Sequence, residues 1–267
     1  MKKRFSHLAT LVGSVLLISA SIAFADPTLQ LDIAGGYYDS TNTLNPETTI
    51  AASSVFTLYA LLDAKDSDGT SALTDSFLAQ DFYLSVAILE SFTDPIDVNL
   101  GSFDISYKKG SVVVNETVNV TSDMIYGNPP VETLLTHDGG DLAPHEVFPT
   151  FFKEYSFKFD LDQFTTAYNV QDYDGTTIGL SADETNKAYY VPFQIDVSNL
   201  DYPYVVHFDL YTIKKGQKEG DIDIAIKAPF SKDAQSAPGA PVPEPATMLL
   251  FGTGLAGLAA VGRRRKN

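Results

Sequence analysis

The chain has 267 residues, of which 44% are apolar and 12% aromatic, with 34 Asp and Glu against 18 Lys and Arg. An apolar fraction of this size excludes wholesale disorder, a collagen-like repeat and a multi-span membrane protein. The net charge of −16 argues against nucleic-acid binding. The absence of Cys excludes disulfide frameworks, thiolate metal sites and cysteine nucleophiles.

Charge is distributed unevenly along the chain. Basic residues stand at both ends, at positions 2–4 and 263–266, and each cluster borders an apolar run. The stretch over 26–242 carries 33 Asp and Glu against 11 Lys and no Arg. This pattern is typical of a chain that meets a membrane at both ends and displays an acidic body between them.

Residues 1–25 have the three parts of a signal peptide. Positive charge precedes an apolar run over 8–24, and the run ends with small residues at Ala23 and Ala25. Signal peptidase binds small side chains at these two positions, so we expect cleavage after Ala25. The alternative is an uncleaved signal anchor, which the three serines inside the apolar run disfavour.

The body over 26–230 is dominated by the period-two alternation of β-strands. Many alternating runs, separated by Gly-, Pro- and Asp-rich turns, predict an all-β fold, an antiparallel β-sandwich of about nine strands. Two stretches, 70–79 and 162–168, are the only candidates for short helices. Pro192 lacks an amide proton and predicts an edge or a bulge in its strand. The nine expected strands span 28–33, 55–62, 82–89, 103–107, 112–120, 155–161, 189–197, 206–210 and 222–226.

No catalytic constellation emerges from the body, which favours a protein that is not an enzyme. The Gly-x-Ser-x-Gly elbow of serine hydrolases is absent. His137 and His145, with acidic neighbours, are candidates for a nitrogen and oxygen metal site, but their spacing matches no recognised motif. The simpler expectation is a polar loop with His145 hydrogen-bonded to backbone. His207 alternates with Val206 and Phe208, which predicts a solvent-facing side chain.

Calcium is the best cofactor candidate in the sequence. Asp66 and Asp68 lie in one turn and Asp172 and Asp174 in another, and carboxylates on a turn can converge on a hard cation. Both turns lack the first Asp and the final Glu of a calcium loop, so any affinity should be low. The alternative is an ordinary solvated Asp turn.

The C-terminal region has three parts. Residues 231–245 are rich in Ala, Pro and Ser, which is typical of an extended linker, and they end in Pro243, Glu244 and Pro245. An apolar run over 246–262 follows, close to the shortest length that spans a bilayer core of about 30 Å. We therefore expect residues 246–267 to form a transmembrane sorting segment whose basic end stays on the cytoplasmic side.

This tail resembles the PEP-CTERM sorting signal of Gram-negative bacteria, with the motif, the apolar segment and the basic end in the same order. The resemblance implies recognition by an exosortase, a membrane-embedded, cysteine transpeptidase-like enzyme that removes the tail, so membrane anchoring would be transient. It makes Pro243, Glu244 and Pro245 substrate positions. It also implies a host that makes exopolysaccharide or a biofilm matrix.

The body itself resembles the uncharacterised choice-of-anchor N class of PEP-CTERM proteins, at residues 142–152, 29–38 and 55–61. That resemblance implies no known activity. Two functions stay open. The first is a non-enzymatic protein of the outer surface or extracellular matrix that binds polysaccharide or protein partners. The alternative is a secreted hydrolase that acts on matrix polysaccharide, which would need a cleft with paired carboxylates of perturbed pKa.

Overall fold

The computed structural model describes residues 28–40, 47–63, 73–89, 99–132, 139–172, 186–201 and 203–237. The predicted signal cleavage at Ala25, the sorting motif and the segment 246–267 lie outside these residues, as do Asp66, Asp68, Asp174 and His137. In the part of the chain that the structure describes, no helix has both the length and the apolarity needed to cross a membrane.

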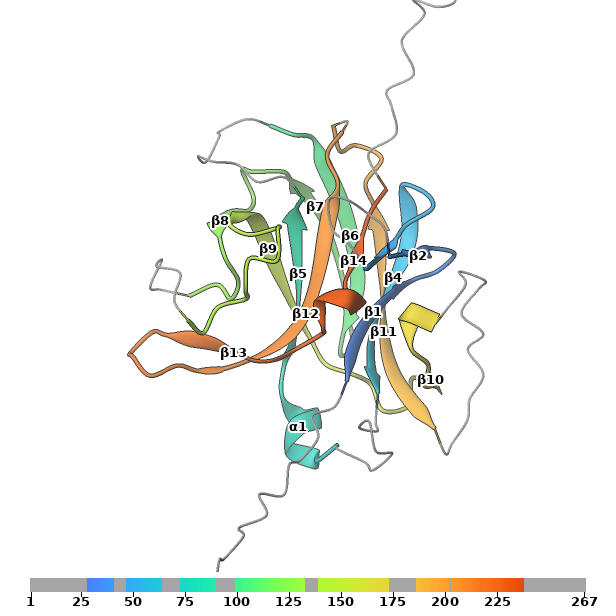
Figure 1. Cartoon of the computed structure of the whole chain (residues 1–267), viewed down its shortest axis with the longest axis vertical. Coiled ribbons are helices and arrows are strands. Elements are labelled where there is room, and N and C mark those ends of the chain that lie inside the picture. Colours follow the sequence, from blue (N-terminus) through green and yellow to red (C-terminus); the bar gives the residue numbers. More distant parts are fainter. Residues whose placement is uncertain are drawn as a thin grey trace, which may run out of the picture.

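Strands make up most of the described chain (Figure 1). Fourteen strands, one short α-helix and two 3-10 turns are present in the described ranges. Their bounds are β1 Leu29–Ile33, β2 Tyr37–Asp39, β3 Thr48–Ile50, β4 Val55–Asp63, α1 Asp75–Ala79, β5 Phe82–Ile88, β6 Ser102–Lys109, β7 Val112–Asn119, β8 Ile125–Gly127, β9 Thr150–Phe157, β10 Phe164–Thr166, η1 Val170–Asp172, β11 Lys187–Asp196, β12 Val206–Lys215, β13 Ile222–Lys227, η2 Phe230–Lys232 and β14 Ala234–Gln235.

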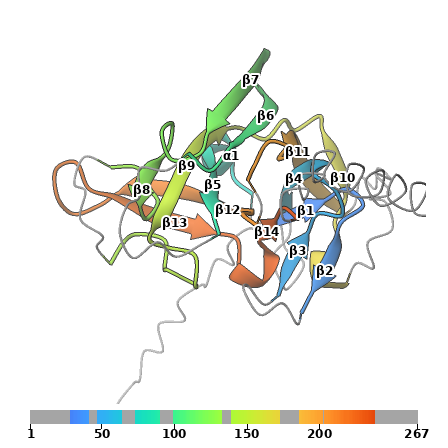
Figure 2. The same cartoon turned by 90° about the horizontal axis from the view of Figure 1, so that it is seen from above.

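The strands form two sheets that pack face to face, as the view from above shows (Figure 2). The first sheet has the order β1-β4-β11-β6-β7, with β10 on β11. The second has the order β2-β3-β14-β12-β5-β9-β8, with β13 on β12. All pairs are antiparallel except β14 with β3. The predicted all-β sandwich is therefore confirmed, with more strands than the nine expected.

Alternate side chains of both sheets fill the space between them. Aromatic rings lie at the centre, where Phe193 packs against Phe157 from the other sheet with ring centroids 5.2 Å apart, and against Tyr107 at 4.9 Å. Edge-to-face and offset contacts of this kind add to the stabilisation from apolar burial. Leu58, Leu84 and many neighbours complete one continuous core.

Two local predictions were wrong. Residues 164–166 of the expected second helix form β10 instead, which pairs with β11 from Phe164 opposite Tyr189 to Thr166 opposite Lys187. The strand expected over 155–161 begins earlier, as β9, and ends at Phe157. In both cases pairing with a neighbouring strand outweighed the local pattern, because tertiary hydrogen bonds and burial override weak propensities.

The folded domain extends past the predicted boundary at Phe230. The 3-10 turn η2 and strand β14 follow that residue, and β14 pairs with both β12 and β3. Ser236 closes the pairing, since its backbone N–H donates to Val206 O at 2.9 Å and its hydroxyl oxygen accepts from Val206 N at 3.1 Å. The first residues of the predicted linker are therefore part of the sandwich.

Candidate functional site

The second sheet is covered on both faces, and the outer cover creates the candidate site. On β12, Val206, Phe208 and Leu210 face the main core, whereas Tyr211 belongs to a second apolar cluster on the outer face. The loop over 139–148 supplies the cover through Leu142, Val147 and Phe148, which pack with Ala87 and Phe152 in this second cluster. Polar side chains on the outer face of β12 are therefore enclosed.

His145, His207, Asp209 and Asp233 meet beneath this cover, and we call them the His–Asp cluster. The Nε2 atoms of the two histidines lie 3.3 Å apart. Asp209 approaches both rings, with Oδ1 at 3.2 Å from His145 Nε2 and Oδ2 at 3.4 Å from His207 Nε2. Asp233 Oδ2 lies 3.5 Å from His207 Nε2. The side chains of all four residues are at most 6% exposed.

Three segments far apart in the sequence position these side chains. His207 and Asp209 are two residues apart on β12, so they share one face of the strand. Asp233 directly precedes β14, which pairs with β12 through His207 opposite Gln235. His145 belongs to a tight turn in which Val147 N donates to Pro144 O at 2.8 Å.

Two contacts fix the ring of His145. Its Nδ1 lies 2.6 Å from the carbonyl oxygen of Ala143, as the sequence predicted for a backbone hydrogen bond. A carbonyl oxygen can only accept, so Nδ1 carries the proton and, in the neutral ring, Nε2 presents its lone pair to the cluster. The ring of Phe230 stacks on the other side at 4.0 Å, with an interplanar angle of 12°.

Electrostatics inside the cluster are strong because water is excluded. Burial by itself would lower the pKa of His207, but the carboxylates of Asp209 and Asp233 raise it above its ordinary value. Burial would raise the pKa of Asp209, yet His207 and His145 lower it well below its usual range. The carboxylates of Asp209 and Asp233 thus stabilise positive charge on the His207 ring.

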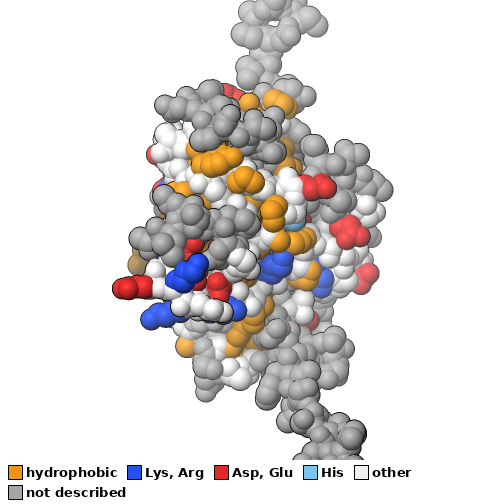
Figure 3. Space-filling model, turned by 60° about the vertical axis from the view of Figure 1, so that its left-hand side comes forward, with side chains coloured by type: hydrophobic (Ala, Val, Ile, Leu, Met, Phe, Trp, Pro, Cys, Tyr) orange, Lys and Arg blue, Asp and Glu red, His pale blue; other side chains and the backbone are white. Residues whose placement is uncertain are grey.

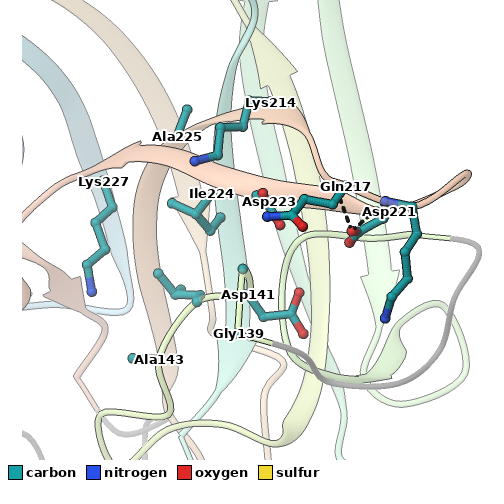
Figure 4. Close-up of a pocket in the computed structure, with 13 residues that line it drawn as sticks. Gly139, Asp141, Ala143, Lys214, Gln217, Asp221, Asp223, Ile224, Ala225 and Lys227 are labelled. Atoms are coloured by element: carbon teal, nitrogen blue, oxygen red, sulfur yellow. Dashed lines mark hydrogen bonds between the residues drawn. The ribbon is translucent and has the colours of Figure 1, made fainter.

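A pocket of about 650 Å³ opens beside the cluster, between the β12–β13 hairpin and residues 139–143 (Figure 4). Lys214 and Asp223 reach it from the hairpin, and Asp141 reaches it from the loop (Figure 4). Asp221 closes the hairpin turn by accepting hydrogen bonds from Gln217 N at 2.9 Å and Lys218 N at 3.2 Å. The three lysines of the lining thus lie on the hairpin side, and the Asp141 carboxylate faces them from the loop.

Lysines gather at this pocket although the body is acidic, and three Asp side chains of the lining balance their charge. Three of the 11 lysines of the stretch over 26–242 line it, namely Lys214, Lys218 and Lys227. The space-filling view shows basic side chains interspersed with acidic ones on this part of the surface (Figure 3). Lys227 also connects the pocket to the cluster, since its Nζ lies 3.2 Å from the ring centroid of Phe230. The mixture of charges suits a polar ligand with several hydrogen-bonding groups.

The structure places the sequence-predicted residues differently from expectation. His207 is fully buried, so the prediction of a solvent-facing side chain was wrong, because the loop over 139–148 covers its face of the sheet. His145, predicted to pair with His137, meets His207 instead. His137 lies outside the described residues. Asp172 is exposed, and its carboxylate accepts a hydrogen bond from Asn169 Nδ2 at 3.1 Å.

Asp209 and Asp233 were missed. The alternation His207–Asp209 on one strand face was available as a signal, because two metal-ligating side chains at spacing two share a face. Asp233 carried no signal, since it lies in the Ala- and Ser-rich stretch assigned to the linker.

Carboxyl groups with raised pKa lie away from the pocket. Burial raises the pKa of Asp32 to about 6, against the lowering effect of hydrogen bonds from Tyr168 and Ile33. Burial also raises the pKa of Glu154, which accepts hydrogen bonds from the Tyr211 hydroxyl and from Val131 N. Neither residue lines the pocket.

The comparison with protein families finds the sorting signal. Residues 241–266 match the family model described as the PEP-CTERM protein-sorting motif. The motif marks an exported, cell-surface protein that is processed by an exosortase, which confirms this part of the sequence-based prediction. Neither the comparison with curated proteins nor that with solved structures gives a match. The signal peptide and the resemblance of the body to the choice-of-anchor N class stay predictions.

Proposed function

We propose that this exported protein is a non-enzymatic component of the outer surface or matrix of a Gram-negative biofilm, and that its sandwich binds polysaccharide. The observation that carries the proposal is the pocket between the β12–β13 hairpin and residues 139–143, in a chain that bears the exosortase signal. The tail would anchor the chain in the membrane only until the exosortase acts.

The chemistry of the pocket supports a sugar ligand. Its volume lies within the range of about 300–1,000 Å³ that is usual for small-ligand sites. Sugar hydroxyls both donate and accept hydrogen bonds, and the lining offers ammonium donors at Lys214 and Lys218 and a carboxylate acceptor at Asp223. An acidic sugar would additionally form ion pairs with the lysines of the pocket. Such a ligand would account for three of the few lysines of an acidic body lying at one pocket.

Binding has more support than hydrolysis. A glycosidase needs one carboxyl group of raised pKa facing a second carboxylate across the substrate. The two carboxyl groups of raised pKa named above, Asp32 and Glu154, are both hydrogen-bonded inside the fold and outside the pocket. The pocket residues that do carry carboxylates therefore serve better as ligand contacts than as an acid and base pair.

The proposal is tested with purified full-length chain and the polysaccharide of its producing strain. We expect binding by the wild type, and at least a tenfold loss of affinity for the Lys214→Ala, Asp223→Ala double variant, since each lost charged hydrogen bond contributes about 1.5–3 kcal/mol. Lys108→Ala is the matched control, because Lys108 is exposed on β6 in the other sheet.

Equal binding by the double variant and the control would refute the pocket as the binding site. Release of reducing ends from the polysaccharide by the wild type would instead favour the hydrolase.

A further inference from the structure

We propose that the His–Asp cluster is a tetrahedral binding site for a divalent transition metal of the zinc type, and that the metal cross-links the domain. None of its four residues lines the pocket between the β12–β13 hairpin and residues 139–143. It is built from His145 on the covering loop, His207 and Asp209 on β12, and Asp233 before β14.

The spacing of the donor atoms fits a metal better than hydrogen bonds. His207 Nε2 faces His145 Nε2, Asp209 Oδ2 and Asp233 Oδ2 at 3.3–3.5 Å. One N–H proton cannot serve three acceptors, and these distances exceed the usual 2.7–3.2 Å of N–H···O bonds. Ligands about 2.0–2.1 Å from a tetrahedral zinc ion lie about 3.3 Å from one another, which is close to the three distances around His207 Nε2.

All four side chains can reach one ion. Each offers a ligand atom within 4.8 Å of the other three, so side-chain shifts of about 1 Å would complete the tetrahedron. The shifts are small because the ligands are already oriented. The bond from His145 Nδ1 to Ala143 O is the supporting contact that metal-ligating histidines usually make, and it directs the Nε2 lone pair inward.

The donor set and charge indicate the class of metal. Two imidazole nitrogens and two carboxylate oxygens suit zinc and its neighbours, whereas calcium takes six to eight oxygen ligands. Two carboxylates with two neutral imidazoles carry a charge of −2, which a divalent ion neutralises. Neutralisation matters here because the side chains of His207, Asp209 and Asp233 are at most 5% exposed, and a net charge in such a place is costly.

The consequence is structural rather than catalytic. Four protein ligands leave no open position for a substrate, as is typical of structural zinc sites. The ion would join the covering loop to the centre of the second sheet and to the last strand, β14. A chain without cysteine has no disulfide to hold such segments, and a metal supplies an alternative cross-link outside the cell.

The test uses the full-length chain, stripped with a chelator and titrated with zinc. We expect one tightly bound zinc per chain, a rise in Tm on adding zinc, and the visible absorption of a tetrahedral ion when cobalt(II) replaces it. His145→Gln and Asp233→Asn should each weaken zinc binding more than about 100-fold, beyond the 10–100-fold effect of losing a supporting contact. His145→Gln changes the covering loop and not a strand, so it keeps the test valid even if variants on β12 fail to fold.

Glu146→Gln is the matched control, because it removes an acidic group from the same turn but outside the cluster. It should keep wild-type zinc affinity. The proposal is overturned if the wild type binds no zinc at micromolar concentration, if calcium binds in preference to zinc, or if His145→Gln and Asp233→Asn bind zinc as tightly as the control.

Discussion

The carboxyl group of Asp32 on β1 is buried, with the residue 3% exposed. Oδ1 accepts from Ile33 N at 2.7 Å, and Oδ2 accepts from the Tyr168 hydroxyl at 2.5 Å. These bonds favour the ionised form, but burial outweighs them and raises the pKa from 3.8 to about 6. Asp32 therefore binds its proton more tightly in the folded state than in the unfolded state.

The sign of the resulting pH dependence follows from linkage. Between about pH 4 and pH 6, Asp32 is ionised in the unfolded chain but still protonated in the folded protein. The free energy of unfolding therefore falls as pH rises through this range, by about 3 kcal/mol in total. Asp32→Asn removes the titration. We compare the free energy of unfolding of the variant with that of wild type, measured by urea unfolding at pH 4 and pH 7. We expect the difference, variant minus wild type, to be about 1–3 kcal/mol larger at pH 7 than at pH 4.

The matched control for this prediction is Asp201→Asn, which removes an exposed carboxyl group. It should leave the difference between the two pH values unchanged. A constant offset between Asp32→Asn and wild type from pH 4 to pH 7 would show that Asp32 has an ordinary pKa in the folded protein.

Single residues show what the sequence could reveal about the site. Alternation along β12 correctly separates His207 from Val206 and Phe208, because side chains on a strand change face at every residue. Alternation says nothing of what covers each face. The covering loop contributes Leu142, whose N–H donates to Pro129 O at 2.8 Å, and this contact depends on segments that no local pattern connects. The burial of His207 was therefore beyond sequence reasoning.

At the scale of elements, the loop over 139–143 protects the free edge of β13. β13 pairs with β12 on one side, and on the other side Ile224 N donates to Gly140 O at 2.8 Å. Covering an edge in this way hinders pairing with a second molecule. The approach is close: a Cβ atom at Gly140 would lie 2.5 Å from Cγ of Asp223 and 3.0 Å from its Cβ.

Gly140→Ala should therefore push the loop away from β13. Rotation of the Asp223 side chain about its Cα–Cβ bond can relieve the contacts with Oδ1 and Cγ, but the contact with Cβ stays, so we expect a destabilisation of about 1–3 kcal/mol, as is usual for overpacking. Urea unfolding measures the cost. Amide hydrogen exchange should show faster exchange at Ile224, whose N–H bonds to the loop.

Gly139→Ala is a matched control for this prediction, since a Cβ atom there meets nothing within 4 Å. It should leave stability and the exchange of Ile224 within experimental error of wild type. Equal effects of the two substitutions would mean that the loop does not rest on β13.

Pro192 illustrates how far an element can be predicted. The missing amide proton indicated an edge or bulge, yet β11 lies between β4 and β6 in its sheet. On one side Pro192 stands opposite Tyr59 of β4. On the other side β10 pairs only up to Tyr189 and β6 only from Phe193, so Pro192 falls in the gap between two short partners. The prediction of an edge strand or a bulge was therefore wrong: β11 is an inner strand and its register with β4 runs through Pro192 without a shift, because the missing N–H falls where no partner strand pairs.

At the scale of the whole molecule, composition and periodicity predicted the fold class because every alternating run needs an apolar layer opposite it. They placed the end of the domain too early. Residues 231–236 have the composition of a linker, but Ala234 and Ser236 are fully buried. Backbone pairing with β12 decides their structure, and such pairing leaves no trace in composition. For the same reason Asp233 escaped notice as a member of the His–Asp cluster.

Sorting is a property of the whole chain, because the motif at residues 241–266 marks the body to which it is joined for export and processing by an exosortase. We expect the exosortase to bind the motif as an extended segment, and proline favours extended backbone. Replacing Pro243, Glu244 and Pro245 together by Ala would permit helix to continue from the apolar run into this segment. We expect the variant to stay in the membrane fraction with its tail attached, in a host that carries the exosortase.

Mass spectrometry of the intact protein and cell fractionation decide this last prediction. The wild type should be lighter than the variant by the mass of the tail. The variant should be found in the membrane fraction only. Pro238→Ala with Gly239→Ala is the control, because these substitutions lie in the same Pro-rich stretch but before the matched residues 241–266. Since the control also loses a proline, its normal processing would assign the effect to the motif and not to the stiffness of the linker. Normal release of the triple variant at the mature mass would contradict recognition through these residues.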